Sequence, residues 1–141
     1  AKNEVKAVKW YRKAAEQGNA KAQFALGVAL MEGQGVAKNE VKAAKWYRKA
    51  AEQGFADAQH CLGVVLMNGW GLAKDEVEAA KWCRKAAEQG GHANVQFALG
   101  TILMNGEGMA KNKAEAVKWF RKAAEQGSAQ AQAALRQLSM L

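Results

Sequence analysis

Two histidines, His60 and His92, are the first candidates for chemistry in this chain of 141 residues. A metal site built on histidine needs further nitrogen, sulfur or carboxylate ligands at regular spacing, most simply a second histidine four residues along a helix. Neither histidine has such a partner. His60 is therefore either a contact residue on an open helix face or an ordinary half-exposed histidine. The sequence predicts no metal and no cofactor.

Nucleophilic chemistry has equally few candidates. Cys61 and Cys83 fit no metal-ligand spacing and no framework of several disulfides. Each is explained as a small buried hydrophobe, although a bridge between them is conceivable because they are expected on facing helices. Serine occurs only at Ser128 and Ser139, and no set of serine, histidine and carboxylate can be assembled around them. The sequence predicts that the chain is not an enzyme.

The elements that position these residues follow from an internal repeat. The motif W-x-R-K-A-A-E-Q-G, in which x is Tyr, Cys or Phe, begins at Trp10, Trp46, Trp82 and Trp119. The first three tryptophans lie 36 residues apart and the fourth follows after 37, with the extra residue in the turn after Gly90. Such periods are typical of helical-repeat proteins, in which each unit buries its apolar faces only by stacking on its neighbours.

Each repeat is predicted to contain two helices. The second-type helix, as in Asn39–Gly54, has an asparagine cap, an apolar stripe and a terminal glycine. The first-type helix, as in Asn19–Gly33, has Gly27 in its interior, where glycine costs about 1 kcal/mol relative to alanine. Its recurrence predicts close approach of a neighbouring helix, with Ala43 and its equivalents opposite. Tryptophan and the following aromatic residue are expected to fill the space between helices.

The repeat divides the chain into one array. The predicted parts are an unpaired second-type helix over residues 1–18, repeats over 19–54, 55–90 and 91–127, and a capping helix over 128–141. The first helix is expected to expose part of Val5, Val8, Trp10 or Tyr11, which would permit self-association. Arg136 replaces the recurrent glycine in the last helix, and this favours a closing role because no further helix must pack there.

This pattern resembles the Sel-one-like repeat (SLR) family, a relative of the tetratricopeptide repeats. The resemblance rests on A-Q-F-A-L-G at Ala22–Gly27, G-Q-G-V at Gly33–Val36 and K-A-A-K-W-Y-R-K-A-A-E-Q-G at Lys42–Gly54, and it extends over nearly the whole chain. It implies an all-α α-solenoid, a right-handed superhelix of antiparallel helix pairs with about eight helices. It also implies a scaffold or adaptor for other proteins, often bacterial and secreted or envelope-associated.

A cysteine-rich branch of that family is linked to β-lactam binding. This chain lacks the cysteine pair that each repeat of that branch carries, so β-lactam binding or hydrolysis remains only a weak alternative.

Contact residues are sought where the copies of the repeat differ. Phe24, Val28 and Met31 are spaced i, i+4 and i+7, off the main apolar stripe of their helix. The resemblance implies that the first-type helices line the concave side, where this second stripe would receive a partner helix or an extended peptide. The alternative is that neighbouring repeats bury the stripe as core. The candidate partner-binding residues are Phe24, Val28, Met31, His60, Val64, Met67, Trp70, Phe97, Thr101 and Met104.

Trp70 is a special case among these candidates. The equivalent loop positions hold Gln34 and Glu107, so folding does not require an aromatic residue there. An exposed loop tryptophan is a candidate contact residue. The alternative is that it folds back onto a neighbouring repeat.

The net charge of +8 raises a polyanion as an alternative partner. Lysines such as Lys6, Lys9 and Lys13 form a face that recurs in every second-type helix and is expected to be convex and solvated. The tryptophans are expected on the opposite, packed side and glutamates interrupt the face, so nucleic acid is disfavoured as a partner.

The cellular compartment stays open. No apolar run approaches the ~18 residues of a membrane span. The chain begins at Ala1 without a signal segment and its first helix is interpreted as a truncated edge, which leaves a bacterial periplasmic, secreted or cytoplasmic location.

Overall fold

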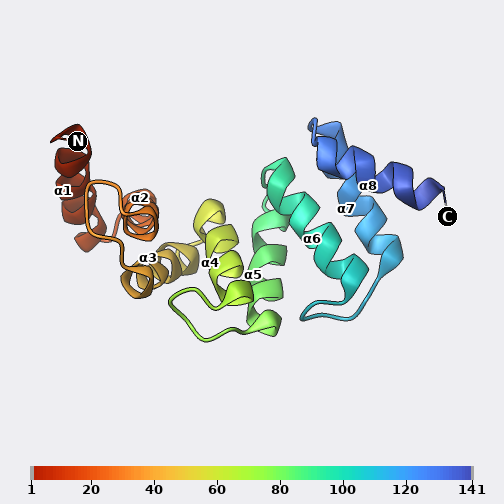
Figure 1. Ribbon diagram of the computed structural model, residues 1–141, viewed down its shortest axis with the longest axis horizontal. Coiled ribbons are helices and arrows are strands. Elements are labelled where there is room, and N and C mark those ends of the chain that lie inside the picture. The colour runs from red at the N-terminus through yellow and green to blue at the C-terminus, as the bar shows by residue number, and fades with distance from the viewer. Residues whose placement is uncertain (1, 141) are drawn as a thin grey trace. The chain divides into compact units, whose positions relative to one another are not determined.

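The computed structural model describes residues 2–140, and within them the chain forms eight α-helices and no strand (Figure 1). Second-type helices alternate with first-type helices, as the repeat predicts. The second-type helices are α1 (Lys2–Glu16), α3 (Glu40–Glu52), α5 (Glu76–Glu88) and α7 (Lys113–Glu125). The first-type helices are α2 (Ala20–Glu32), α4 (Ala56–Asn68), α6 (Ala93–Asn105) and α8 (Ala129–Ser139).

The helices belong to two compact units. The first unit contains α1 to α4 and ends at Asp75, and the second begins at Glu76 and contains α5 to α8. Within each unit, every helix packs on the next one along the chain. No helix within residues 2–140 combines the length and the hydropathy needed to cross a lipid bilayer.

The predicted asparagine caps are confirmed at two second-type helices. The side chain of Asn39 accepts a hydrogen bond from the backbone N–H of Lys42 (3.0 Å), and Asn112 does the same for Glu115 (3.0 Å). The backbone N–H of each cap also donates to the preceding first-type helix, Asn39 to Leu30 at 2.8 Å. Each capping asparagine thus caps its own helix with its side chain and forms a backbone hydrogen bond to the preceding helix.

Two interior glycines, Gly27 of α2 and Gly100 of α6, make room for aromatic rings. A Cβ atom built on Gly27 would lie 2.7 Å from the Tyr47 ring, and one on Gly100 would lie 2.6 Å from the Phe120 ring. Tyr47 is 4% exposed and Phe120 is 3% exposed. The predicted close approach is confirmed, and the carbonyl oxygen of the expected Ala43 would lie 3.4 Å from a Cβ on Gly27. The Tyr47 ring is nearer still, because a flat ring fills the notch that the missing Cβ leaves.

The expectation that the tryptophans fill the space between helices is wrong for Trp10, and only Trp119 is buried. Trp10 is 69% exposed, Trp46 and Trp82 are half-buried, and Trp119 is buried. The residue that follows each tryptophan takes the interior position, since one residue advances about 100° around an α-helix. These interior residues are Tyr47, Cys83 and Phe120, while Tyr11 of α1 stays partly exposed.

Buried glutamines connect successive helices by hydrogen bonds. In the first unit, the amide of Gln23 donates to the Ala15 carbonyl at the end of α1 (3.1 Å) and its carbonyl accepts from Gln53 after α3 (2.8 Å). In the second unit, Gln96 accepts from Gln126 (2.7 Å). Gln23 and Gln96 are almost fully buried, so these bonds satisfy polar groups that would otherwise be costly to remove from water.

Gly27→Ala should destabilise the chain by about 1 kcal/mol. The new Cβ forces the buried Tyr47 ring to shift, which costs ~1–3 kcal/mol in a packed core, and this exceeds the ~1 kcal/mol gain in helix propensity. Urea unfolding followed by circular dichroism measures the difference. In a Tyr47→Leu background the same change should be neutral or stabilising. Stabilisation by Gly27→Ala in the otherwise unchanged chain would show that the ring does not fill this notch.

Candidate protein-binding surface

The ten predicted contact residues lie on the first-type helices and one loop, and none of them is buried. We call this set the first-helix stripe. Val64 is 36% exposed and Trp70 is 45% exposed, and the other members are half-buried. On α2 they are Phe24, Val28 and Met31; on α4 they are His60, Val64 and Met67, followed by Trp70 in the next loop; on α6 they are Phe97, Thr101 and Met104.

Two members of the stripe also hold helices together. The Phe24 ring centroid lies 5.5 Å from that of Phe55 and 6.1 Å from that of Tyr47. In the second unit, the centroids of Phe97 and Phe120 are 5.6 Å apart. Tilted aromatic pairs at this separation contribute to packing. A charge at Phe24 or Phe97 would therefore disturb the fold, whereas Val64, Met67 and Trp70 take no part in these ring pairs.

Thr101 replaces the valines of the other two copies. Its hydroxyl donates to the Phe97 carbonyl of its own helix at 3.1 Å. The hydroxyl proton is thereby used within α6, as is usual for threonine on a helix. The polar substitution at this position does not by itself provide a free donor for a partner.

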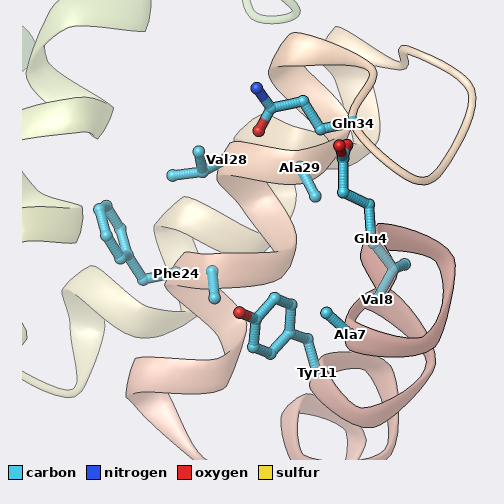
Figure 2. A pocket seen from close by; sticks show the side chains of 9 residues that line it. Glu4, Ala7, Val8, Tyr11, Phe24, Val28, Ala29 and Gln34 are labelled. Carbon is cyan, nitrogen blue, oxygen red and sulfur yellow. The ribbon is translucent and has the colours of Figure 1, made fainter. Parts of the chain in front are cut away.

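A hollow of about 340 Å³ lies between α1 and α2, and we call it the α1–α2 groove (Figure 2). Figure 2 shows the Tyr11 ring extending from α1 toward α2. Tyr11 is 39% exposed, whereas Tyr47 at the same position of the next repeat is 4% exposed. The lining residues are Glu4, Ala7, Val8, Tyr11, Phe24, Ala25, Val28, Ala29 and Gln34.

The sequence anticipated part of this groove. The expected exposure on α1 is confirmed for Val5, Trp10 and Tyr11, while Val8 is 6% exposed and forms the floor of the groove. Sequence reasoning did not join Tyr11 to the stripe residues of α2. The signal was present, because Tyr11 stands 36 residues before Tyr47, and within residues 2–140 a first-type helix precedes α3 but not α1.

The tryptophans lie beside the lysine face, so their predicted place on the opposite side is wrong. The Nζ atom of Lys13 lies 5.5 Å from the Trp10 ring centroid, and Lys122 lies 4.6 Å from that of Trp119. Lys49 and Lys85 stack on Trp46 and Trp82 in the same way, at 4.9 Å and 4.8 Å. Residues three apart share one helix face, and the lysine stem covers the ring while its cation meets the π-face. The W-x-x-K spacing was the sequence signal for this arrangement.

The charge beside the indole differs between copies. In the second unit, the indole N–H of Trp82 donates to Glu78 at 3.1 Å and that of Trp119 donates to Glu115 at 3.2 Å. The position equivalent to Glu115 on α1 is Lys6. Around Trp10 the neighbouring charges are accordingly Lys6, Lys9 and Lys13. Together with Trp10, these three lysines line a hollow of about 220 Å³.

The cysteines are free thiols with little nucleophilic character. Burial, with a smaller contribution from Asp57, raises the pKa of Cys61 to about 11. Burial raises the pKa of Cys83 to about 12 against the opposing effect of Arg84. Both thiols are protonated near neutral pH, and a thiol reacts through its thiolate. Across residues 2–140, no group of three or more histidine, cysteine or acidic side chains is arranged to hold a metal ion.

Solved structures with the same architecture include three bacterial proteins. A Sel1 repeat protein from Oxalobacter formigenes is 44% identical, with a TM-score of 0.82, and the match covers 91% of this chain and 52% of that protein. The c5321 protein of uropathogenic Escherichia coli, a protective antigen displaying an SLR fold, is 41% identical, with a TM-score of 0.84 and coverages of 87% and 26%. Cysteine rich protein B of Helicobacter pylori is 29% identical, with a TM-score of 0.70 and coverages of 92% and 92%.

This chain therefore spans about half the length of the Oxalobacter protein and about a quarter of the length of c5321. The predicted all-α solenoid class is confirmed by these neighbours. No match was found among the curated proteins.

The family model of the Sel1 repeat matches four segments of the chain, residues 1–19, 20–55, 56–91 and 93–128. Together these segments include most of the sequence, and the predicted resemblance is confirmed. Proteins built from Sel1 repeats are generally scaffolds for protein interaction. The chain belongs to the Sel1 repeat family.

Proposed function

We propose that this chain is a non-enzymatic scaffold that binds a protein or peptide along the first-helix stripe. The observation that carries the proposal is an apolar stripe that stays accessible on the first-type helices, with Val64 36% and Trp70 45% exposed. In this proposal the repeats over 19–54, 55–90 and 91–127 each present one copy of the stripe.

The residues of the stripe suit a partner with apolar side chains. Methionine adapts its shape to different partners, and Met31 and Met67 are half-buried at equivalent positions of α2 and α4. Trp70 adds a large ring that folding does not demand, and tryptophan is a frequent centre of binding energy in interfaces. An amphipathic helix or an extended peptide with spaced apolar residues fits this surface.

Val64→Asp and Met67→Glu should abolish binding while leaving the helices intact. A charge placed in a desolvated apolar contact loses its hydration without gaining a partner. Peptides selected on the immobilised chain from a random phage-displayed library provide the ligands, and fluorescence anisotropy measures their affinity for each variant. Helicity by circular dichroism should match that of the unchanged chain.

Val41→Asp is the matched control, because Val41 is 52% exposed on α3 and lies outside the stripe. It should keep full affinity. Equal affinity of the Val64→Asp chain and the control for every selected peptide would refute binding through the stripe.

We propose, as a second candidate function, polyanion binding at the hollow around Trp10. Lys6, Lys9 and Lys13 surround an indole that is 69% exposed, and the stacking of Lys13 on this ring places charge and aromatic surface together. Proteins that bind single-stranded nucleic acid combine these two features, with bases stacked on aromatic rings and phosphates near lysines.

If the Trp10 hollow binds polyanions, affinity for a labelled single-stranded DNA of about 20 nucleotides should fall about 20-fold between roughly 50 and 200 mM salt. Three lysine–phosphate contacts give a salt slope of roughly −2, and a fourfold change in salt then gives this factor. Trp10→Ala should weaken binding at least about fivefold, since stacking one base contributes ~1–3 kcal/mol. Trp70→Ala is the control and should have no effect. Undetectable binding, or binding that salt does not change, rules this candidate out.

A further inference from the structure

An ion pair joins the second-type helices α5 and α7 of the second unit. The guanidinium of Arg84 donates to the two carboxylate oxygens of Glu115 at 2.7 Å and 3.4 Å, and the same carboxylate accepts the indole N–H of Trp119 at 3.2 Å. The hydrogen bond from Arg84 lowers the pKa of Glu115, which favours the ionised form. Two parallel hydrogen bonds are the arrangement in which arginine binds a carboxylate most specifically. This place therefore holds a carboxylate between a guanidinium and an indole.

The first unit repeats these donors but not the carboxylate. Arg12 of α1 and Trp46 of α3 stand at the positions of Arg84 and Trp119, whereas Lys42 of α3 replaces Glu115. Within residues 2–140, Arg12 forms no ion pair and the Trp46 indole N–H forms no hydrogen bond. Three donors, two of them cationic, thus stand where the second unit has a carboxylate and its two donors.

The helices around both places are packed in the same way. A Cβ on Gly35, in the loop after α2, would meet the Glu4 carbonyl of α1, and one on Gly108, in the loop after α6, would meet the equivalent Glu76 carbonyl of α5. The cap of α3 donates to α2 at 2.8 Å, and the cap of α7 donates to α6 at 2.9 Å. Because these contacts recur, α1 and α3 should hold Arg12 near Trp46 as α5 and α7 hold Arg84 near Trp119.

The acidic side chains nearest in sequence do not take the missing place. Glu88, four residues after Arg84, lies 3.7 Å from it, but Arg12 and the equivalent Glu16 form no such ion pair within the described residues. Glu40 of α3 pairs with Lys38 at 3.7 Å. Helix α1 carries five basic residues against two acidic ones, so the local field attracts an anion.

We propose that Arg12, Lys42 and Trp46 form a binding site for the carboxylate of an acidic side chain from a protein partner. The carboxylate takes the place that Glu115 has in the second unit, between the guanidinium of Arg12 and the indole N–H of Trp46. Lys42 adds a second positive charge at the same place, where the second unit has the negative charge of Glu115. Charge complementarity of this kind contributes to the specificity of a protein interface.

The exposure of the donors favours a side chain of a bound protein over a free anion. Arg12 and Trp46 are half-buried and Lys42 is exposed, so water competes for each of them. A carboxylate that is linked to other contacts has a high effective concentration at such a site. The inference rests on the proposed function in this one respect, that the partner is a protein. Its residues lie on α1 and α3, whereas the first-helix stripe lies on α2, α4, α6 and one loop.

The indole N–H signals of the five tryptophans in ¹H–¹⁵N NMR spectra test this site. The probe is N-acetylated tetraglutamate, added to the full chain, with the matching tetraglutamine as its control. Tetraglutamate should shift the Trp46 signal saturably, with half-saturation near about 1 mM, and tetraglutamine should not. The Trp82 and Trp119 signals should stay in place, since Glu78 and Glu115 already accept their N–H groups.

Three outcomes of this titration would contradict the proposal. They are no saturable shift of Trp46 up to about 10 mM tetraglutamate, a shift confined to Trp10, and an equal shift of Trp46 by acetate at the same carboxylate concentration. The second outcome would assign the peptide to the Trp10 hollow, and the third would assign the Trp46 site to free anions.

Variants of the chain locate the carboxylate. Arg12→Gln should weaken tetraglutamate binding at least about fivefold, as expected for the loss of a charge-assisted hydrogen bond. Arg121→Gln removes the same charge from the equivalent position of α7 and is the matched control, which should keep its affinity within about twofold. Equal affinities of these two variants would show that net charge alone attracts the peptide, and the proposal would fail.

Lys42→Glu tests the geometry without a ligand, because it restores the charge pattern of the second unit. The Trp46 indole signal should move toward those of Trp82 and Trp119, and tetraglutamate should no longer shift it. An unchanged Trp46 signal in this variant, with helicity by circular dichroism intact, would refute the site. Val64→Asp, which removes binding through the stripe in the proposed function, should keep the tetraglutamate shift of Trp46. Loss of that shift in Val64→Asp would place the acidic peptide on the stripe and count against the site.

Discussion

A ring seated against a helix glycine is the contact on which the arrangement of two helix pairs, α2 with α3 and α6 with α7, depends. Gly27 and Gly100 admit the rings of Tyr47 and Phe120 so closely that a single added Cβ would collide with them. The contact fixes both the depth and the register of the pairing, and buried glutamine bridges, such as Gln23 with Gln53, then satisfy polar groups brought inside with it. At α1, the equivalent Tyr11 is 39% exposed and lines the α1–α2 groove.

Most of the fold was predictable because the same sequence repeat occurs several times in one chain. A residue that recurs at every copy has the same neighbours in every copy, so the helices, the Asn39 and Asn112 caps and the role of the interior glycine could be inferred from spacing. The errors concern direction around a helix. Tryptophan and the following residue are adjacent in sequence but about 100° apart on the helix. Both were expected between helices, but in α3 and α5 only the second residue is buried. The buried glutamines were missed because a glutamine that recurs in every repeat can face solvent or can form a hydrogen bond inside the protein, and the sequence alone does not distinguish these two cases.

The candidate binding surface was harder to predict for a physical reason. At positions that vary between the repeats, packing does not require one particular residue. The sequence therefore shows which positions folding leaves free, but it does not show what those residues bind. The structure adds the exposure of Val64 and Trp70, and it distinguishes them from Phe24 and Phe97, whose rings pack on other rings. The α1–α2 groove required coordinates, because it depends on which face of α1 the helix α2 leaves uncovered.

The chain has two tyrosines at equivalent positions, and their reactivity reports whether a first-type helix seals the ring of its partner. Tyr47 lies under Gly27, and burial raises the pKa of its phenol well above the usual value, whereas Tyr11 is open to solvent in the groove. Nitration of the native chain with tetranitromethane at mildly alkaline pH, followed by mass spectrometry of the peptides, should modify Tyr11 and spare Tyr47. Modification of both tyrosines at the same rate in the folded chain would contradict the packing described for these helix pairs.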